Sequence, residues 1–162
     1  MPEKKTLQRA RKNAREGKAP STQAGEFVRE EIHHVREGKH GARSAKQAIA
    51  IGLSKARRAG VELPPPKPGR TSERTRRAAA RDLSRGRSRS RRRKSPRRAR
   101  AVARALRHEG RQAGSRKALS RQAKQSARRR TASSRSSAAR KAARTRARRR
   151  NSGAKSSSRS RS

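Results

Sequence analysis

The sequence contains no cysteine, tryptophan or tyrosine, and Phe27 is its only phenylalanine. Without cysteine there is neither a disulfide framework nor thiolate chemistry. No apolar run approaches the length needed to cross a membrane, and the N-terminus has no apolar signal core. We therefore expect a cytoplasmic protein that stays in the compartment where it is made and has no membrane partner.

Large apolar residues are also scarce. Leu, Ile, Val and Phe together number 14 of 162 residues, well below the rough 20% under which a highly charged chain is expected to be disordered. Nine of these 14 residues lie between Phe27 and Leu63. One short segment can therefore bury a core, and the remainder is predicted not to bury enough apolar surface to offset its conformational entropy.

Basic residues are abundant: the chain has 52 Lys and Arg against 10 Asp and Glu, a net charge of +42. The charge is uneven, with a net +8 on residues 1–63 and +34 on residues 64–162. Nucleic acid is the most abundant cellular polyanion that matches such a charge. A basic segment that binds membranes usually carries Trp, Phe or Leu on an apolar face, and here Trp is absent and Phe27 is the only Phe.

Apolar spacing predicts two helices, at residues 21–37 and 44–60. In the first, Ser21 or Thr22 is expected to cap the N-terminus. In the second, Ser44 and Gln47 form a Ser-x-x-Gln capping box, and Gly60 is placed as a left-handed C-cap. The apolar positions of the two helices are Ala24, Phe27, Val28, Ile32, Val35, Ala45, Ala48, Ile49, Gly52, Leu53 and Ala56. The small residues Ala48 and Gly52 would let the helices approach closely.

The predicted fold class is small all-α. Residues 1–20 form a basic arm, compatible with a short, wholly polar helix, and residues 21–63 form an αα-hairpin. Residues 64–69 are a stiff proline-rich spacer, and residues 70–162 are an intrinsically disordered Arg/Ala/Ser-rich tail. A hairpin of about 40 residues is marginally stable alone, so a homodimer through residues 21–63 is one way to complete it.

Short Ala/Arg stretches recur in the tail, without a fixed period. Ala and Arg are good helix formers, but like charges four residues apart oppose a helix in free solution. We expect transient helices that become firm once phosphates remove the repulsion. The stretches are residues 74–83, 99–109, 117–130 and 138–150.

The loop before the second helix is a candidate phosphate site, because a helix N-terminus presents free N–H groups and partial positive charge to anions. Lys39, His40, Arg43, Ser44 and Lys46 lie there. Arginine binds phosphate as a bidentate fork, and basic blocks usually act as interaction tails. The remaining candidates are Lys55, Arg57, Arg58, Arg91, Arg92, Arg93, Arg97, Arg98, Arg128, Arg129, Arg130, Arg148, Arg149 and Arg150.

Metal binding and catalysis are not expected. Glu30, His33, His34 and Glu37 lie within reach of one another on the first helix, and His40 follows. Glu30 and His33 have the spacing of a di-iron ligand pair, but a full site needs a second such pair from another helix, and none exists. We therefore predict no metal site, no cofactor and no enzymatic activity.

The stretch PSTQAGEFVREEIHHVREGKHGARSAKQAIAIGLSKARRAG, followed by LPPP, resembles a family of short basic bacterial proteins that is catalogued as a domain of unknown function. Members of that family are sometimes labelled DNA-binding. The tail is similar in kind to histone-like and protamine-like proteins. The resemblance implies a bacterial cytoplasmic protein and brings no catalytic residues with it.

These features favour binding of nucleic acid without sequence specificity, as histone-like coating and compaction of DNA in a bacterial nucleoid. Two alternatives stay open. The first is an RNA-binding or ribosome-associated protein, because phosphate neutralisation does not distinguish the two polymers. The second is a helical protein-interaction module at residues 21–63, with the tail as a nucleic-acid tether.

Overall fold

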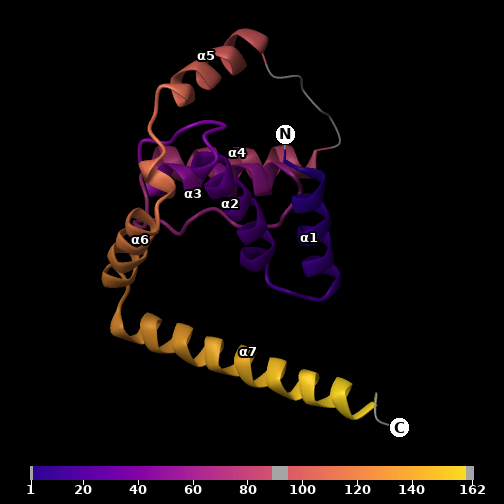
Figure 1. Cartoon of the computed structure of the whole chain (residues 1–162). Helices are drawn as coiled ribbons and strands as arrows, with labels where there is room; N and C mark the ends of the chain where they lie inside the picture. The colour runs from indigo at the N-terminus through magenta and orange to yellow at the C-terminus, as the bar shows by residue number, and fades with distance from the viewer. Residues whose placement is uncertain (1, 89–94, 160–162) are drawn as a thin grey trace. The chain divides into compact units, whose positions relative to one another are not determined.

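The computed structural model describes the backbone of residues 2–88 and 95–159 and the side chains up to residue 148. All regular secondary structure in these residues is helical (Figure 1). The contacts divide the chain into two units, Met1–Ser120 and Arg121–Ser162, which are described separately.

Three helices form the N-terminal part of the first unit. They are α1 (Lys4–Arg15), α2 (Pro20–Arg36) and α3 (Ala45–Arg58). The two helices predicted at 21–37 and 44–60 are thus confirmed as α2 and α3. The N-terminal arm holds the expected short helix, but α1 is not polar all round, because Ala10 is buried in the core and Leu7 packs against it.

Local signals at the ends of α3 act largely as predicted. The Ser44 hydroxyl accepts a hydrogen bond from the Gln47 N–H at 3.2 Å, and the Gln47 side chain accepts one from the Arg43 N–H at 2.9 Å. Gly60 has φ +91°, and the Val61 N–H donates to the Ala56 carbonyl at 3.1 Å, which completes a Schellman motif. The predicted cap of α2 is wrong, because the helix begins at Pro20 and Ala19 is its cap without a side-chain hydrogen bond.

Helices α2 and α3 approach closely at Gly52. A Cβ atom at this position would lie 2.7 Å from the Val28 Cα, so only glycine fits. Phe27 is 1% exposed beside this crossing. The core around Phe27 also contains Ala24 of α2, Ala56 of α3, Ala10 of α1 and Val61 after α3, and Leu7, Leu53 and Leu63 pack against it.

The prediction of a disordered tail is wrong. Beyond the proline-rich spacer the chain forms α4 (Glu73–Arg87), α5 (Pro96–Arg107), a 3₁₀ turn η1 (Gln112–Gly114), α6 (Arg116–Arg128) and α7 (Ala132–Arg159). The predicted Ala/Arg stretches coincide closely with these helices. The positions of the helices were therefore predicted correctly, but the helix propensity of Ala and Arg outweighs the repulsion between like charges more than expected. None of the helices in the described residues combines the length and apolar character that a membrane crossing requires.

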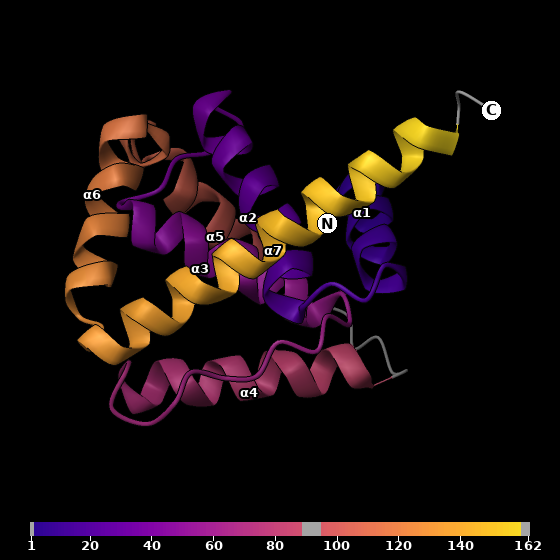
Figure 2. The same ribbon diagram turned by 90° about the horizontal axis from the view of Figure 1, so that it is seen from below.

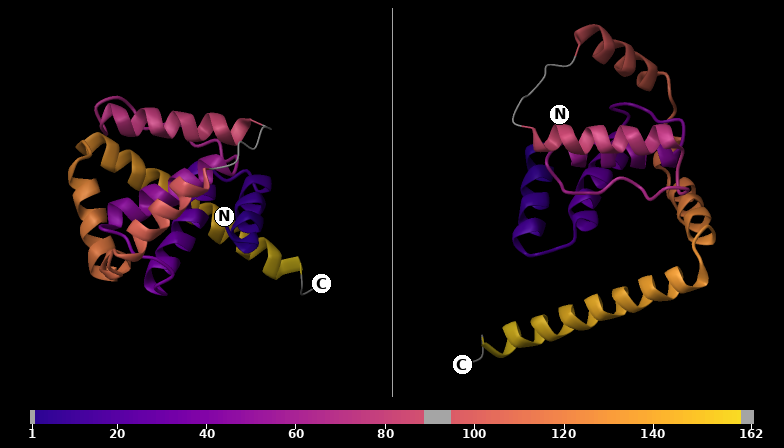
Figure 3. Two further views of the ribbon diagram at one scale, coloured as in Figure 1. Left: turned by 90° about the horizontal axis from the view of Figure 1, so that it is seen from above. Right: turned by 180° about the vertical axis from the view of Figure 1, so that it is seen from behind.

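Helix α4 packs against α3 through small residues. Ala79 is 6% exposed, and a Cβ atom on Gly86 would lie 1.9 Å from the Arg57 carbonyl oxygen. The Ser54 hydroxyl donates to the Asp82 carboxylate. The extended segment 61–72 runs back along α4, as the views in Figures 2 and 3 show. A count of large apolar residues overlooks this contact, because alanine and glycine make it.

The turn η1 covers the other end of the hairpin. Ala113 joins Val35, Ala42 and Ala48 in a second small core. The Arg36 Nε donates to the Gly114 carbonyl at 2.7 Å. Helix α1 and the turn η1 thus pack against α2, and α4 and η1 pack against α3, so the hairpin is extended by contacts from within the chain.

Gly52→Ala should lower the free energy of unfolding by about 1–3 kcal/mol, because the added methyl group forces the α2 and α3 backbones apart. Gly25 supplies the matched control: it lies within α2, and a Cβ there meets nothing within 4 Å. Gly25→Ala should raise stability by about 0.5–1 kcal/mol. Urea unfolding followed by circular dichroism measures both, and equal stability of Gly52→Ala and the unmodified chain would contradict the close crossing.

The ion pair between Glu62 and Arg87 should make stability depend on pH. The Arg87 guanidinium, by hydrogen bonding to the carboxylate, holds the pKa of Glu62 below its ordinary value of 4.5. A carboxyl group whose pKa is lowered by folding stabilises the protein while ionised, and this contribution disappears as pH falls through the lowered pKa. Glu62→Gln should therefore be less stable than the unmodified chain at neutral pH, and unfolding curves should converge in acid. A difference in stability between Glu62→Gln and the unmodified chain that was the same in acid as at neutral pH would argue against this ion pair.

Candidate nucleic-acid interface

The loop that enters α3 is held by backbone contacts with the α5 end and the turn after it. The Gly41 N–H donates to the Leu106 carbonyl at 2.8 Å and the Ala42 N–H to the Gly110 carbonyl at 3.1 Å. These amides are therefore engaged within the protein and not available to an anion. The N–H groups in the first turn of α3 have no acceptor within the helix, as at every helix N-terminus.

The loop residues predicted to bind phosphate fall into two groups. Arg43, Ser44 and Lys46 are exposed around the start of α3. Lys39 is exposed as well, but its Nζ lies 3.0 Å from Glu37 and 3.5 Å from Glu3. His40 turns inward, with its Nε2 3.1 Å from the Glu31 Oε1. The structure therefore gathers Arg43 and Lys46 at the helix N-terminus and places Lys39 and His40 against carboxylates.

Three predicted cations on α3 are engaged in tertiary contacts. The Lys55 Nζ lies 2.5 Å from the Glu31 Oε2. Arg57 is only 6% exposed and donates to the carbonyls of Leu63 at 3.1 Å and Pro64 at 3.3 Å. Burial lowers the pKa of Arg57, against the opposing effect of the Asp82 charge. Arg58 is exposed and lies 3.5 Å from Asp82.

The predicted tail arginines are exposed wherever the structure describes their side chains. Arg97 and Arg98 begin α5, residues 128–130 end α6 and follow it, and Arg148 lies on α7. Arg91, Arg92 and Arg93 lie outside the described residues. Arg149 and Arg150 belong to α7, but their side chains are not among those described.

The structure adds a feature that the sequence reasoning missed: each tail helix carries a row of exposed cations three or four residues apart. This spacing keeps the members of a row on one helix face. The signal was present in the sequence, but it has meaning only if these segments are helices. The rows are Arg74, Arg77, Arg81 and Arg85 on α4; Arg97, Arg100, Arg104 and Arg107 on α5; Lys117, Arg121, Lys124 and Arg128 on α6; and Lys141, Arg144 and Arg148 on α7.

Two open depressions lie beside these cations. One, of about 570 Å³, is lined by Glu73 and three members of the α4 row. The other, of about 390 Å³, lies between the loop before α3 and the turn after α5, and Glu37 and Glu109 line it together with Arg107 and Arg111. The second depression is balanced in charge, so the α4 depression suits a phosphate better.

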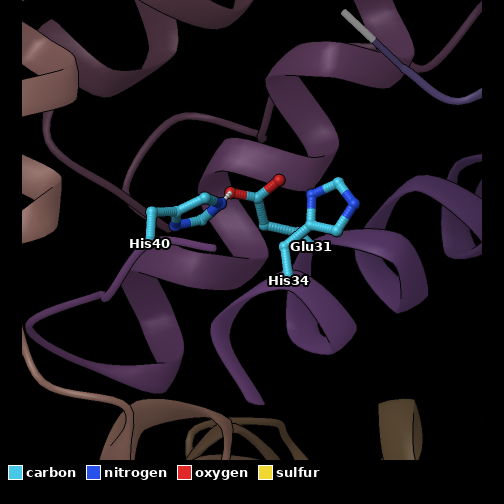
Figure 4. Close-up of side chains that lie close together, drawn as sticks. All are labelled: Glu31, His34 and His40. Carbon is cyan, nitrogen blue, oxygen red and sulfur yellow. Dashed lines mark ion pairs between the residues drawn. The ribbon is translucent and has the colours of Figure 1, made fainter. Parts of the chain in front are cut away.

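A different group of residues has the chemistry to hold a metal ion. Glu31 and His34 lie on α2, His40 lies in the loop before α3, and their ligand atoms are all within 4.8 Å of one another. Figure 4 shows the two imidazole rings on either side of the Glu31 carboxylate. The pair singled out in the sequence, Glu30 and His33, is different: Glu30 is buried towards Lys55, whereas His33 is exposed.

Comparison with known protein families gives one match, to the segment that contains α2 and α3. Residues 17–67 match the model of a family of unknown function (DUF6496). The match spans α2, the loop, α3 and the proline-rich segment, which is less than half of the chain. Neither the curated proteins nor the solved structures gave a match. The resemblance is thus supported as one to an uncharacterised domain.

Arg57 and Lys46 should separate folding from phosphate binding. Arg57→Ala should lower the free energy of unfolding by about 1–3 kcal/mol, because the buried guanidinium that donates to the Leu63 and Pro64 carbonyls is lost. Lys46→Ala, at an exposed position, should change stability by less than about 0.5 kcal/mol and weaken DNA binding. Urea unfolding and DNA titration of both variants test this. An Arg57→Ala protein that is as stable as the unmodified chain but binds DNA more weakly would show that Arg57 contacts DNA and contradict its structural role.

Proposed function

We propose that this protein binds nucleic acid through the phosphate backbone and without reading sequence, as a histone-like protein that coats or compacts DNA in a bacterial nucleoid. The observation that carries the proposal is the set of exposed cation rows on α4, α5, α6 and α7. Phosphate contacts of this kind supply affinity and position but carry no sequence information.

The row on α5 illustrates the argument. Arg97, Arg100, Arg104 and Arg107 are all exposed, and none of them forms an ion pair with a carboxylate among the described residues. The row extends over eleven residues, and its ends lie about 15 Å apart along the helix. A DNA duplex presents roughly nine phosphate charges over this length. Every arginine of the row can therefore find a phosphate at once.

Among the described residues, acidic side chains neutralise these rows only at Arg77, which lies 3.3 Å from Glu73. The tail beyond Pro64 contains only Glu73, Asp82 and Glu109. Asp82 is used by Ser54 and Arg58, and Glu73 pairs with Arg76 and Arg77. The like charges left on the helix surfaces repel one another, and a polyanion relieves that repulsion. Arginine is suited to this role because its fork binds phosphate oxygens bidentately.

A salt titration tests the mechanism. Each phosphate neutralised on duplex DNA contributes about −0.9 to the slope of log affinity against log salt concentration. If ten or more cations bind, the slope of the full-length chain should be about −9 or steeper. Affinities for two unrelated duplexes should be alike. A shallow slope, or a strong preference for one duplex, would contradict the proposal.

The α5 row provides a sharper version of the experiment. Replacing Arg97, Arg100, Arg104 and Arg107 with Gln should make the slope less steep by up to about 3.6, and replacing them with Lys should leave it nearly unchanged. The matched control replaces four exposed alanines of the same helix with Gln: Ala99, Ala101, Ala103 and Ala105. It alters no charge, so its slope should equal that of the unmodified chain. Competition with structured RNA then decides which polymer is preferred.

A further inference from the structure

The buried carboxylate of Glu31 is held in an unusual way. Glu31 is 1% exposed, and neither of its oxygens accepts a hydrogen bond of good geometry. Instead the Oε2 atom lies 2.5 Å from the Lys55 Nζ and the Oε1 atom 3.1 Å from the His40 Nε2. A buried carboxylate whose oxygens accept no hydrogen bond still has lone pairs available to a further partner.

The hydrogen bond of His40 fixes which of its nitrogens carries the proton. The Nδ1 atom lies 3.1 Å from the Gly41 carbonyl oxygen, which can only accept, so Nδ1 donates. In the neutral ring Nε2 then carries a lone pair, and this lone pair faces the Glu31 Oε1. Two electron-rich atoms at this distance need a cation between them or a second proton on the ring.

His34 has the same arrangement with its nitrogens exchanged. Its Nε2 donates to the Glu3 carboxylate at 2.9 Å, which leaves Nδ1 as the ligand atom. In Figure 4 the His34 ring lies beside the Glu31 carboxylate on the side opposite His40. Histidines that bind metals almost always donate their other N–H to a carboxylate or a backbone carbonyl. Glu3 and the Gly41 carbonyl supply both kinds of partner here.

Distances and charge agree with a small divalent cation. Two ligands at about 2.0–2.1 Å from a tetrahedral zinc ion lie about 3.3 Å apart, close to the 3.1 Å between the Glu31 Oε1 and the His40 Nε2. Carboxylates also outnumber ammonium groups in the ion-pair network to which the three ligands belong. The carboxylates are Glu3, Glu30, Glu31 and Glu37, and the ammonium groups are Lys39 and Lys55.

We propose that Glu31, His34 and His40 bind one divalent transition-metal ion such as Zn²⁺, through Glu31 Oε1, His34 Nδ1 and His40 Nε2. Two imidazoles and one carboxylate form a known zinc ligand set that leaves the fourth position to water. The ion joins α2 to the loop before α3 and so fixes the start of α3. Lys55, on the second Glu31 oxygen, and Glu3, on His34, are positioning residues.

Titration of the chelator-treated full-length protein with Zn²⁺, followed by calorimetry, tests the site. One equivalent should bind, and His34→Gln and His40→Gln should each weaken the affinity at least tenfold. His33→Gln is the matched control, because His33 is the exposed neighbour of His34 on the same helix; its affinity should be unchanged. Glu3→Gln should weaken binding about tenfold or more through His34.

Two results would overturn the site: the absence of stoichiometric binding, or an equal loss of affinity in His33→Gln. Co²⁺ added to the unmodified protein gives a measurement that does not depend on any variant folding. Visible absorption bands of nitrogen- and oxygen-bound Co²⁺ of low coordination number, removed by one equivalent of Zn²⁺, support the site. A spectrum identical to that of free aqueous Co²⁺ would refute it.

Discussion

The close crossing of α2 and α3 at Gly52 is the contact on which the rest of the structure depends. With so few large apolar residues, the chain cannot separate its helices with a bulky core, and the backbone of α3 instead meets that of α2 at Val28. The same solution recurs where Gly86 of α4 meets the Arg57 carbonyl and where Gly114 meets α2. Close packing of small residues gains many dispersion contacts for little apolar area. It also makes Gly52 and Gly86 hard to replace.

The few acidic residues are used mainly within the protein. Glu31 pairs with Lys55 across α2 and α3, and Asp82 of α4 holds Ser54 and Arg58. Carboxylates spent on these contacts are not available to neutralise the cation rows. The surfaces of the tail helices therefore carry far more exposed cations than carboxylates. This division explains how a chain of net charge +42 can hold a tertiary structure and still expose most of its cations.

The proposed metal site and the proposed phosphate contacts use different residues. Glu31, His34 and His40 lie within the segment that matches the family of unknown function, whereas the cation rows lie beyond it. Around α3 the two meet: His40 belongs to the ligand group, and Arg43 and Lys46 are exposed a few residues later. An ion that fixes this loop would also fix the position of these two cations.

The sequence by itself determined the local features, because each rests on neighbouring residues. The spacing of Phe27 and its neighbours placed α2, the Ser44 and Gln47 pair placed the start of α3, and Gly60 placed its end. The Ala/Arg stretches likewise marked where the tail helices lie. The net positive charge was also readable without any structure.

Which of these segments pack together, and which charges remain exposed, could be seen only in the tertiary structure. The docking of α4 depends on Ala79 and Gly86, and small residues leave no apolar periodicity to detect. Arg57 stabilises the fold because the segment after α3 turns back and its carbonyls accept hydrogen bonds from the guanidinium. Glu31 met His40 because of the path of the loop between α2 and α3. Such contacts depend on how distant backbone segments approach one another, which the order of neighbouring residues does not specify.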